Sequence, residues 1–182
     1  MDNSRIIELL RQGERRQAFN LMVRGYSERL YWIIRGIVHT HTDTDDALQN
    51  TWVSVWNAID TFREDSRLYT WLYRIATNEA LTLLRKNRLR AALSFSDYAA
   101  QVEDSLAADP TFNGDKLQLA LQKAIASLPP RQQAVFTMRY FEEMPYSDIA
   151  EILGVSESSL KASYHIAREK VLEKIKKNDI DN

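Results

Sequence analysis

The stretch PYSDIAEILGVSESSL, residues 145–160, contains the clearest local pattern of the chain. It predicts two short helices that meet at Gly154, because glycine adopts the positive φ of a tight turn without steric cost. Ala150 is small enough for the second helix to pack closely across the first. Leu160 is expected to turn inward, and Ser156 to cap the second helix. This spacing is typical of a helix-turn-helix, whose second helix lies in a DNA major groove.

Helical periodicity continues around this motif and defines a C-terminal unit, residues 116–182. A helix that starts near Lys116 is predicted to end at Pro129-Pro130, because proline lacks an amide donor and clashes with the preceding turn. Further helices are predicted at about residues 131–141, 145–153 and 156–176. The alternative to DNA binding is that the two helices form a hairpin whose apolar residues only pack in the protein core.

The N-terminal part, residues 1–87, predicts an all-helical bundle. The first 109 residues contain no proline and only three glycines, so nothing there indicates strands separated by turns. Apolar residues recur at spacings of three and four, which places them on one helical face. Helix starts are predicted at Thr42–Asp46 and at Asp65-Ser66, where hydroxyl and carboxylate groups can accept hydrogen bonds from free backbone amides.

Between these units the helical period is lost. Residues 88–115 are rich in Ala, Ser and Asp, and Asp109-Pro110 and Asn113-Gly114 are turn signals. We interpret this segment as a flexible linker, too polar to bury a core of its own. The expected fold class is therefore all-α, with two small helical domains, residues 1–87 and 116–182, joined by the linker.

Composition narrows the class of protein. The chain has 182 residues, of which 45% are apolar and 27% charged, as in a soluble globular protein. It contains no cysteine, which excludes disulfides, thiolate catalysis and Cys-ligated zinc and fits a reducing cytosol. No apolar run approaches the roughly 20 residues that span a bilayer. We expect a cytoplasmic protein without membrane insertion, cofactor or bound metal.

The net charge of −1 conceals an uneven distribution. Four cations stand within residues 85–90, five acids and no Lys or Arg within 94–115, and lysines accumulate after Leu160. A near-neutral chain can still present basic faces to phosphate. Solvated helix surfaces explain the charges alone equally well.

Three groups of residues in the C-terminal unit follow one another in a fixed order: Leu128–Gln133, Phe136 with Arg139 and Tyr140, and Tyr146–Ala150 with Leu153–Ser156. In this order they resemble domain 4 of the extracytoplasmic-function (ECF) sigma factors of bacterial RNA polymerase. That domain recognises the −35 promoter element.

Three further groups in the N-terminal unit are Asp43–Gln49, Thr61–Ser66, and Tyr69–Asn78 closed by Arg85. They resemble the acidic core-binding helix, the base-capturing loop and the promoter-melting helix of domain 2 in the same family. The resemblance implies a transcription initiation factor, not an enzyme. Such a factor binds core RNA polymerase, directs it to specific promoters and assists DNA melting.

The resemblance also assigns roles to single residues. Binding to the β′ clamp helices of core polymerase is assigned to Asp43, Asp45, Asp46 and Gln49. Contact with −10 DNA is assigned to Phe62, Arg63, Ser66, Tyr73, Asn78, Arg85 and Lys86. Contact with −35 DNA is assigned to Ser158, Ser159, Lys161, Ala162, Ser163 and Arg168. The other implied partners are the β flap of the polymerase and an anti-sigma factor.

Two positions depart from the family pattern. Asn50 stands where glutamate is common, and Ser163 stands where arginine is usual, so the promoter sequence does not follow from the residues. Helical spacing favours a core position over base stacking for three tryptophans, Trp52, Trp56 and Trp71.

Two other functions fit parts of the sequence. A stand-alone helix-turn-helix regulator would use its N-terminal half to dimerise or to sense a signal, with Asp43–Gln49 as a helix cap. A helical enzyme or a metal site would use His39 and His41 with the nearby carboxylates. Capping and partner contact account for those carboxylates more simply, and no glycine-rich phosphate loop accompanies them.

Overall fold

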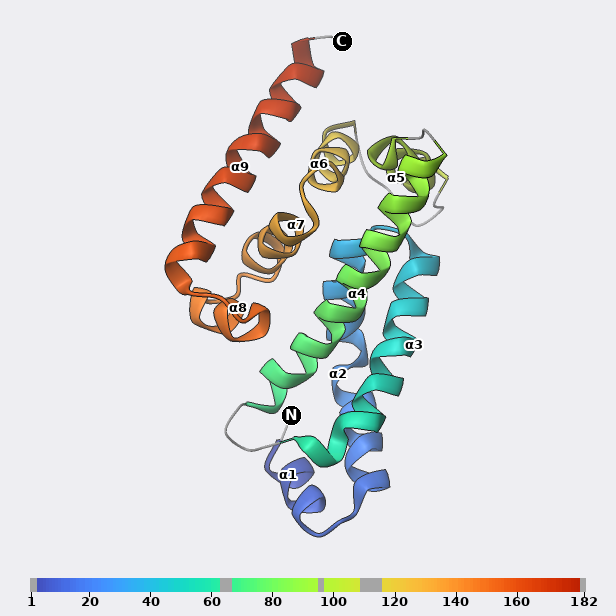
Figure 1. Ribbon diagram of the computed structural model, residues 1–182, viewed down its shortest axis with the longest axis vertical. Coiled ribbons are helices and arrows are strands. Elements are labelled where there is room, and N and C mark those ends of the chain that lie inside the picture. Colours follow the sequence, from blue (N-terminus) through green and yellow to red (C-terminus); the bar gives the residue numbers. More distant parts are fainter. Residues whose placement is uncertain (1–2, 63–66, 95–96, 109–115, 181–182) are drawn as a thin grey trace.

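The computed structural model describes residues 3–62, 67–94, 97–108 and 116–180. Within these ranges the regular structure is helical throughout, and no strand occurs (Figure 1). The predicted all-α class is confirmed. None of the helices in this described part of the chain has the length and apolar character needed to cross a bilayer.

The N-terminal bundle consists of α1 (Asn3–Arg11), α2 (Arg15–Val38), α3 (His41–Ala58), the 3-10 turn η1 (Ile59–Thr61) and α4 (Leu68–Leu93). The helices α2, α3 and α4 contact one another, and α1 packs on α2. The largest fully buried side chains of this bundle are Ile6, Met22, Leu30, Ile33, Ile34, Ile37, Ile59, Leu72 and Leu84. On α2 they recur at spacings of three and four, so this helix buries one continuous face.

The start of α3 lies slightly before the predicted one. Thr40 is the capping residue, and its hydroxyl oxygen accepts a hydrogen bond from the Asp43 amide at 3.2 Å. The described part of α4 begins at Leu68. The helix start predicted at Asp65-Ser66 lies outside the described residues.

The C-terminal unit consists of α6 (Lys116–Ala126), α7 (Pro130–Phe136), the π-helical turn η2 (Thr137–Phe141), α8 (Tyr146–Leu153) and α9 (Glu157–Ile180). Pro130 stands in the first turn of α7, where its missing amide leaves no hydrogen bond unmade. In Figure 1, α6 and α7 lie between α9 and α4. Both α7 and α8 contact α9 on one side and α4 on the other.

The segment expected to be an irregular linker, residues 88–115, contains helical structure. The last turn of α4 extends into it, and a further helix, α5, spans Tyr98–Ala107 with Asp97 as its capping residue. The prediction of lost periodicity was wrong here. Val102 and Leu106 lie four residues apart, are buried and pack toward α6. Two apolar positions among so many Ala, Ser and Asp residues give a helical pattern too weak to be recognised in the sequence.

The two units share one hydrophobic core. The buried cluster of the N-terminal bundle continues into α7, η2, α8 and α9 through Ala134, Val135, Met138, Met144, Ile149, Ile152 and Leu160. We call the contact of α2 and α4 with α7, η2 and α8 the seam. The helices pack tightly at Gly36, where an added Cβ would lie 2.4 Å from the methyl carbon of Thr137. Any larger residue at this position would force the Thr137 side chain or the helices to shift.

Candidate polymerase- and DNA-binding surfaces

At the acidic start of α3, some side chains are exposed to solvent and one is hydrogen-bonded within the helix start. Asp45, Asp46 and Gln49 are exposed on the outer face of the helix. Asp43 is half-buried, and its carboxylate accepts a hydrogen bond from the Thr40 hydroxyl at 2.8 Å. Three of the four residues assigned to core binding thus form one open surface, whereas Asp43 helps to hold the helix start.

The residues assigned to −10 DNA are dispersed. Asn78, Arg85 and Lys86 are exposed on α4. Phe62 is half-buried, with its ring 5.2 Å from that of Trp71. Arg63 and Ser66 lie outside the described residues. The exposed part of this set is therefore confined to the middle and the end of α4.

Tyr73 does not lie on an open surface. It is 2% exposed, and its ring centroid is 4.3 Å from that of Tyr69. Burial raises the pKa of Tyr73, and burial raises the pKa of Tyr69 to about 12. The carboxylate of Glu142, which follows η2, adds to both shifts. The expected DNA contact of Tyr73 is thus not available in this arrangement, because the residue is buried next to the C-terminal unit.

The helix-turn-helix has the predicted local geometry. Gly154 ends α8 in the left-handed region, with φ of 64°. Ser156 accepts a hydrogen bond from the Ser159 amide at 3.3 Å, and Leu160 is 2% exposed. These three predictions are confirmed. A glycine turn followed by a capped second helix directs the first turns of α9 outward.

Most residues assigned to −35 DNA lie on the open side of α9. Ser158, Ser159, Lys161, Ala162 and Arg168 are exposed and Ser163 is half-buried. The ammonium of Lys161 is 4.0 Å from a carboxylate oxygen of Glu157, and Arg168 is 3.7 Å from that of Glu169. Both ion pairs are exposed and easily exchanged for phosphate.

Three arginines that are not among the individually assigned site residues lie in the seam. Arg67 pairs with the carboxylate of Asp148, and its guanidinium is 3.8 Å from that of Glu151. Arg74 donates to the backbone carbonyl of Glu151 at 2.9 Å. Arg88 donates to three acceptors in the C-terminal unit, the carbonyls of Ala126 and Leu128, both at 2.6 Å, and the side chain of Gln133 at 2.9 Å. The sequence separations of seven and fourteen residues could have indicated this, because they place the three arginines on one side of a helix.

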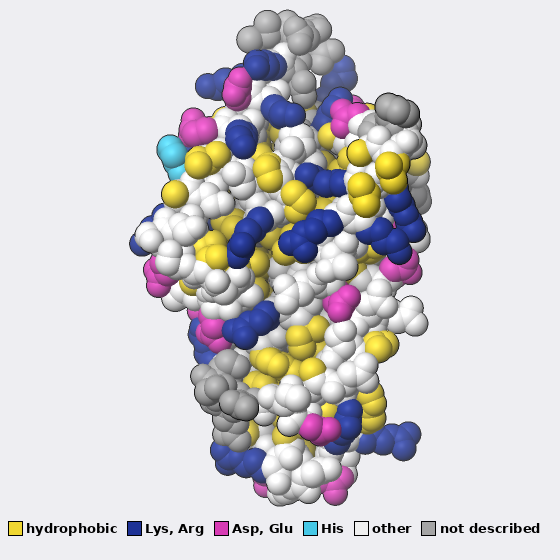
Figure 2. Space-filling view, viewed as in Figure 1, with side chains coloured by type: hydrophobic (Ala, Val, Ile, Leu, Met, Phe, Trp, Pro, Cys, Tyr) yellow, Lys and Arg dark blue, Asp and Glu magenta, His cyan; other side chains and the backbone are white. Residues whose placement is uncertain are grey.

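Basic side chains also gather outside the seam. Figure 2 shows Lys and Arg side chains across the face where α9, α6 and α4 lie. A hollow between these helices is lined by Arg88, Lys123, Lys174 and Lys177, among others. The near-neutral net charge of the chain therefore conceals a basic face, which suits contact with nucleic acid.

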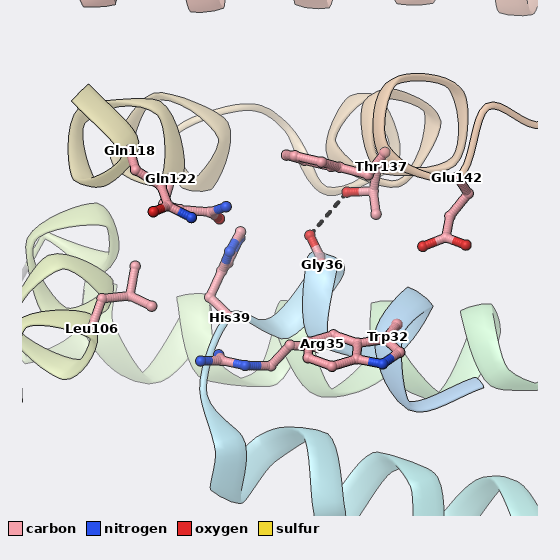
Figure 3. Close-up of a pocket in the computed structure, with 10 residues that line it drawn as sticks. Trp32, Arg35, Gly36, His39, Leu106, Gln118, Gln122, Thr137 and Glu142 are labelled. Carbon is pink, nitrogen blue, oxygen red and sulfur yellow. Dashed lines mark hydrogen bonds between the residues drawn. The ribbon is translucent and has the colours of Figure 1, made fainter. Parts of the chain in front are cut away.

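A pocket of about 310 Å³ lies beside the seam, between α2, α5, α6 and η2 (Figure 3). Trp32, Arg35 and His39 line it from the N-terminal bundle. The dashed line in Figure 3 marks the hydrogen bond from the Thr137 hydroxyl to the Gly36 carbonyl, 2.9 Å long. Because its walls come from both units, the pocket exists only while the seam is closed.

His39 is part of this buried contact. It is 2% exposed, ends α2 with φ of 69°, and lies against the side-chain amide of Gln133. Burial is the largest cause that lowers its pKa to about 3; a hydrogen bond with the Gln122 side chain acts in the opposite direction, and the charges of Arg35 and Arg88 act with burial. The imidazole is therefore neutral near pH 7. Among the residues that the structure describes, no three His, Cys, Asp or Glu side chains converge as a metal site requires.

Comparison with known proteins identifies both units. The family described as Sigma-70 region 2 matches residues 22–90, and Sigma-70, region 4 matches residues 118–171. RNA polymerase sigma-H factor of Pseudomonas aeruginosa is 27% identical, over 93% of this chain and 91% of the relative. The ECF RNA polymerase sigma-E factor of Haemophilus influenzae is 28% identical, over 93% of both. The chain belongs to the ECF sigma factors.

Solved structures agree with this assignment. CnrH, solved in complex with the cytosolic domain of CnrY, is 25% identical with a TM-score of 0.64, over 92% of this chain and 91% of that one. RpoE of Bartonella quintana, solved in complex with the anti-sigma factor NepR, is 23% identical with a TM-score of 0.65, over 87% and 96%. The second likeness concerns the fold alone.

ECF sigma factors are transcription initiation factors and not an enzyme family. The stand-alone regulator is not favoured, because region 2 accounts for the N-terminal bundle that this alternative leaves to dimerisation or sensing. Region 2 reaches residue 90, so the exposed residues Asn78, Arg85 and Lys86 of α4 lie within it. Region 4 contains the whole helix-turn-helix.

Proposed function

We propose that this sigma factor divides its work between its two units. Residues 1–87 bind core polymerase, recognise the −10 element and assist melting, and residues 116–182 recognise the −35 element, with 88–115 joining them. The observation that supports this division is the exposure of two separate surfaces, the acidic face of α3 and the first turns of α9. The chain carries no catalytic group of its own and acts in the cytoplasm.

Core polymerase binds the open face of Asp45, Asp46 and Gln49. Two carboxylates and an amide on one helical face offer acceptors and a donor to the cationic and amide groups of the β′ clamp helices. Asp43 contributes by holding the helix start through Thr40. The β flap of the polymerase contacts the C-terminal unit.

Promoter DNA contacts two helices. The middle of α4 offers Asn78 as a hydrogen-bonding group, and the last part of the helix offers Arg85 and Lys86 as phosphate ligands. The first turns of α9 offer small hydroxyl side chains and Lys161, which suit a major groove. Opening the duplex unstacks a base at a cost of a few kcal/mol, and the loop assigned to this step, which includes Phe62, Arg63 and Ser66, would receive it.

An anti-sigma factor is a further partner. The structural relatives CnrH and RpoE were both solved with a second protein bound, and for RpoE that protein is an anti-sigma factor. An inhibitor of this kind would hold this chain away from polymerase until a signal releases it. The gene beside that of the sigma factor is the first place to look for it.

Reconstitution with core RNA polymerase tests the proposed function. The purified chain is mixed with core polymerase, and complex formation and promoter-dependent transcription are measured on a genomic DNA library. We expect a complex and transcripts that start at a defined set of sites. If no complex forms and the chain alone protects specific DNA sites, the stand-alone regulator replaces the proposal.

A further inference from the structure

The pocket beside the seam has open aromatic rings in its wall. Trp32 of α2 is 56% exposed and Phe141, at the end of η2, is 43% exposed, and both line the pocket. The buried side chain of Leu106 in α5 adds an aliphatic wall. Aromatic side chains bury a large area when a flat group packs against them. This part of the pocket therefore suits a planar apolar ligand.

The two ends of the pocket differ in charge. In Figure 3, His39, Gln118 and Gln122 lie at one end, and Glu142 lies at the opposite end. The guanidinium of Arg35 extends toward the end with His39, where its positive charge acts on the imidazole. One end of the pocket thus has a cation among polar side chains, and the other has a carboxyl group.

The neighbours of His39 define which ring nitrogen carries the proton. The Gln133 side-chain oxygen accepts a hydrogen bond from Arg88 at 2.9 Å, so the amide nitrogen of Gln133 faces Nε2 of His39. Nε2 is then an acceptor, and the neutral imidazole carries its proton on Nδ1. Gln122 lies beside the ring, but Nδ1 makes no hydrogen bond of normal geometry within the part of the chain that the structure describes. A buried N–H and a guanidinium at the same end favour an anionic acceptor.

We propose that this pocket binds a small planar aromatic carboxylate. The carboxylate lies at the end with Arg35 and His39, and the ring packs against Trp32 and Phe141. Glu142 restricts the ligand to one negative charge, because a second carboxylate would meet a like charge at the far end. Burial already raises the pKa of Glu142, so this end disfavours negative charge.

The site lies between the two units, because its walls come from α2 on one side and from α6 and η2 on the other. A ligand that contacts both walls and the closed seam therefore stabilise each other. The inference goes beyond the proposed function. Its test needs neither polymerase nor DNA, so the two can fail separately.

Calorimetric titration of the full chain with benzoate, benzamide and terephthalate tests the ligand class. Benzoate is expected to bind saturably, with one molecule per chain. Benzamide has the same shape without the charge and is expected to bind about tenfold more weakly or worse, since hydrogen bonds to charged groups are the stronger ones. Terephthalate adds a second carboxylate and is also expected to bind more weakly. Absence of saturable benzoate binding, or equal binding of benzoate and benzamide, overturns the inference.

Substitutions then assign the two ends. Arg35→Gln is expected to weaken benzoate binding about tenfold or more. The matched control is Arg24→Gln, at an exposed arginine of the same helix about 17 Å away, which should leave binding unchanged. Glu142→Gln is expected to strengthen terephthalate binding and to leave benzoate binding unchanged. Equal losses in the two arginine variants would contradict the proposed site.

The indole N–H resonance of Trp32 locates the ligand without changing a charged residue. The chain contains four tryptophans, and Trp32→Phe identifies which resonance belongs to Trp32. Benzoate should shift this resonance in the wild type more than the other three. This measurement decides the question even if Arg35→Gln disturbs the fold. A shift confined to the other indoles would place the ligand elsewhere and overturn the inference.

Discussion

The side-chain amide of Gln133 in α7 donates a hydrogen bond to the backbone carbonyl of Ile37 in α2 at 3.2 Å, and its oxygen accepts one from Arg88 in α4 at 2.9 Å. Gln133 is fully buried. One amide thus joins the C-terminal unit to two helices of the N-terminal bundle. A buried polar group that loses its partner costs more than the bond contributes, so this contact fixes how the units meet.

Gln133→Ala is expected to lower the free energy of unfolding by about 2–3 kcal/mol, because it leaves the Ile37 carbonyl and part of the Arg88 guanidinium unsatisfied. The matched control is Gln132→Ala, at the neighbouring position, whose side chain accepts a hydrogen bond from Lys170 at the surface. That change should stay within about 0.5 kcal/mol. Urea denaturation measures both. Equal, small losses would show that the amide does not hold the seam.

Gly36→Ala tests the tight packing of α2 against Thr137 of η2. In a helix without tertiary contacts, alanine would stabilise by about 1 kcal/mol relative to glycine. Here the new methyl would meet the Thr137 methyl at 2.4 Å, so we expect a net loss of stability and a looser seam. Adding Thr137→Ser removes that methyl, keeps a hydroxyl for the Gly36 carbonyl, and should restore stability. Thermal unfolding of the wild type, both single variants and the double variant measures the coupling between the two positions. Additive changes in stability would contradict direct contact between residues 36 and 137.

Local structure was predictable from the sequence where it depends on neighbouring residues. Gly154, Ser156 and Leu160 are confirmed because turn, cap and inward position are set within about two helical turns. The seam was not predictable, because a helix face that meets distant residues looks the same as one that meets solvent. Tyr73 shows the consequence: it was assigned to DNA and is buried beside the C-terminal unit.

The helix α5 was missed for a different physical reason. Its buried face consists of Ala99, Val102 and Leu106, which pack near Ala126 of α6. Such a small apolar stripe contributes little to the stability of the helix on its own. An ion pair between Glu103 and Lys123, 2.5 Å long, also holds the helix against α6. The carboxylate of Asp97, a typical capping residue, was the signal that could have marked its start.

The buried His39 predicts a dependence of stability on pH. Its pKa is about 3 in the folded chain and about 6.5 when unfolded, so below pH 6.5 the unfolded chain binds a proton that the folded chain does not. Stability is therefore complete above pH 6.5 and falls as the pH decreases toward 3. The expected loss from His39 between pH 7 and pH 5 is about 2 kcal/mol.

The measurement compares urea denaturation at pH 7 and pH 5 for the wild type and for His39→Asn. Asparagine tolerates the positive φ of this position and does not titrate, so the variant should lack this part of the pH dependence. His41→Asn, at an exposed histidine, should keep it. Equal pH dependence in the wild type and in His39→Asn would show that the imidazole can be protonated without cost.

Substitutions in α3 should separate polymerase binding from stability. Asp46→Ala with Gln49→Ala is expected to weaken affinity for core polymerase about tenfold or more, since each hydrogen bond to a charged group contributes about 1.5–3 kcal/mol. Both side chains are exposed, so unfolding should change by less than about 0.5 kcal/mol. Asp43→Ala should show the opposite pattern, because Asp43 accepts from the Thr40 hydroxyl. Equal losses of polymerase affinity and of DNA affinity in the Asp46→Ala, Gln49→Ala variant would show that the division of labour is wrong.

Lys161 provides the test of the recognition helix. It is exposed in the second turn of α9, and its ammonium is 4.0 Å from the exposed carboxylate of Glu157. Lys161→Ala is expected to lower affinity for promoter DNA and to reduce the salt slope by about 0.9, the value for one lost phosphate contact. Lys176→Ala removes the same charge from an exposed site about 22 Å further along the helix and should leave the slope unchanged. Anisotropy titrations of the holoenzyme on a promoter from the transcription screen measure both. If the two variants lose slope equally, the contact comes from the general charge of α9 and not from its first turns.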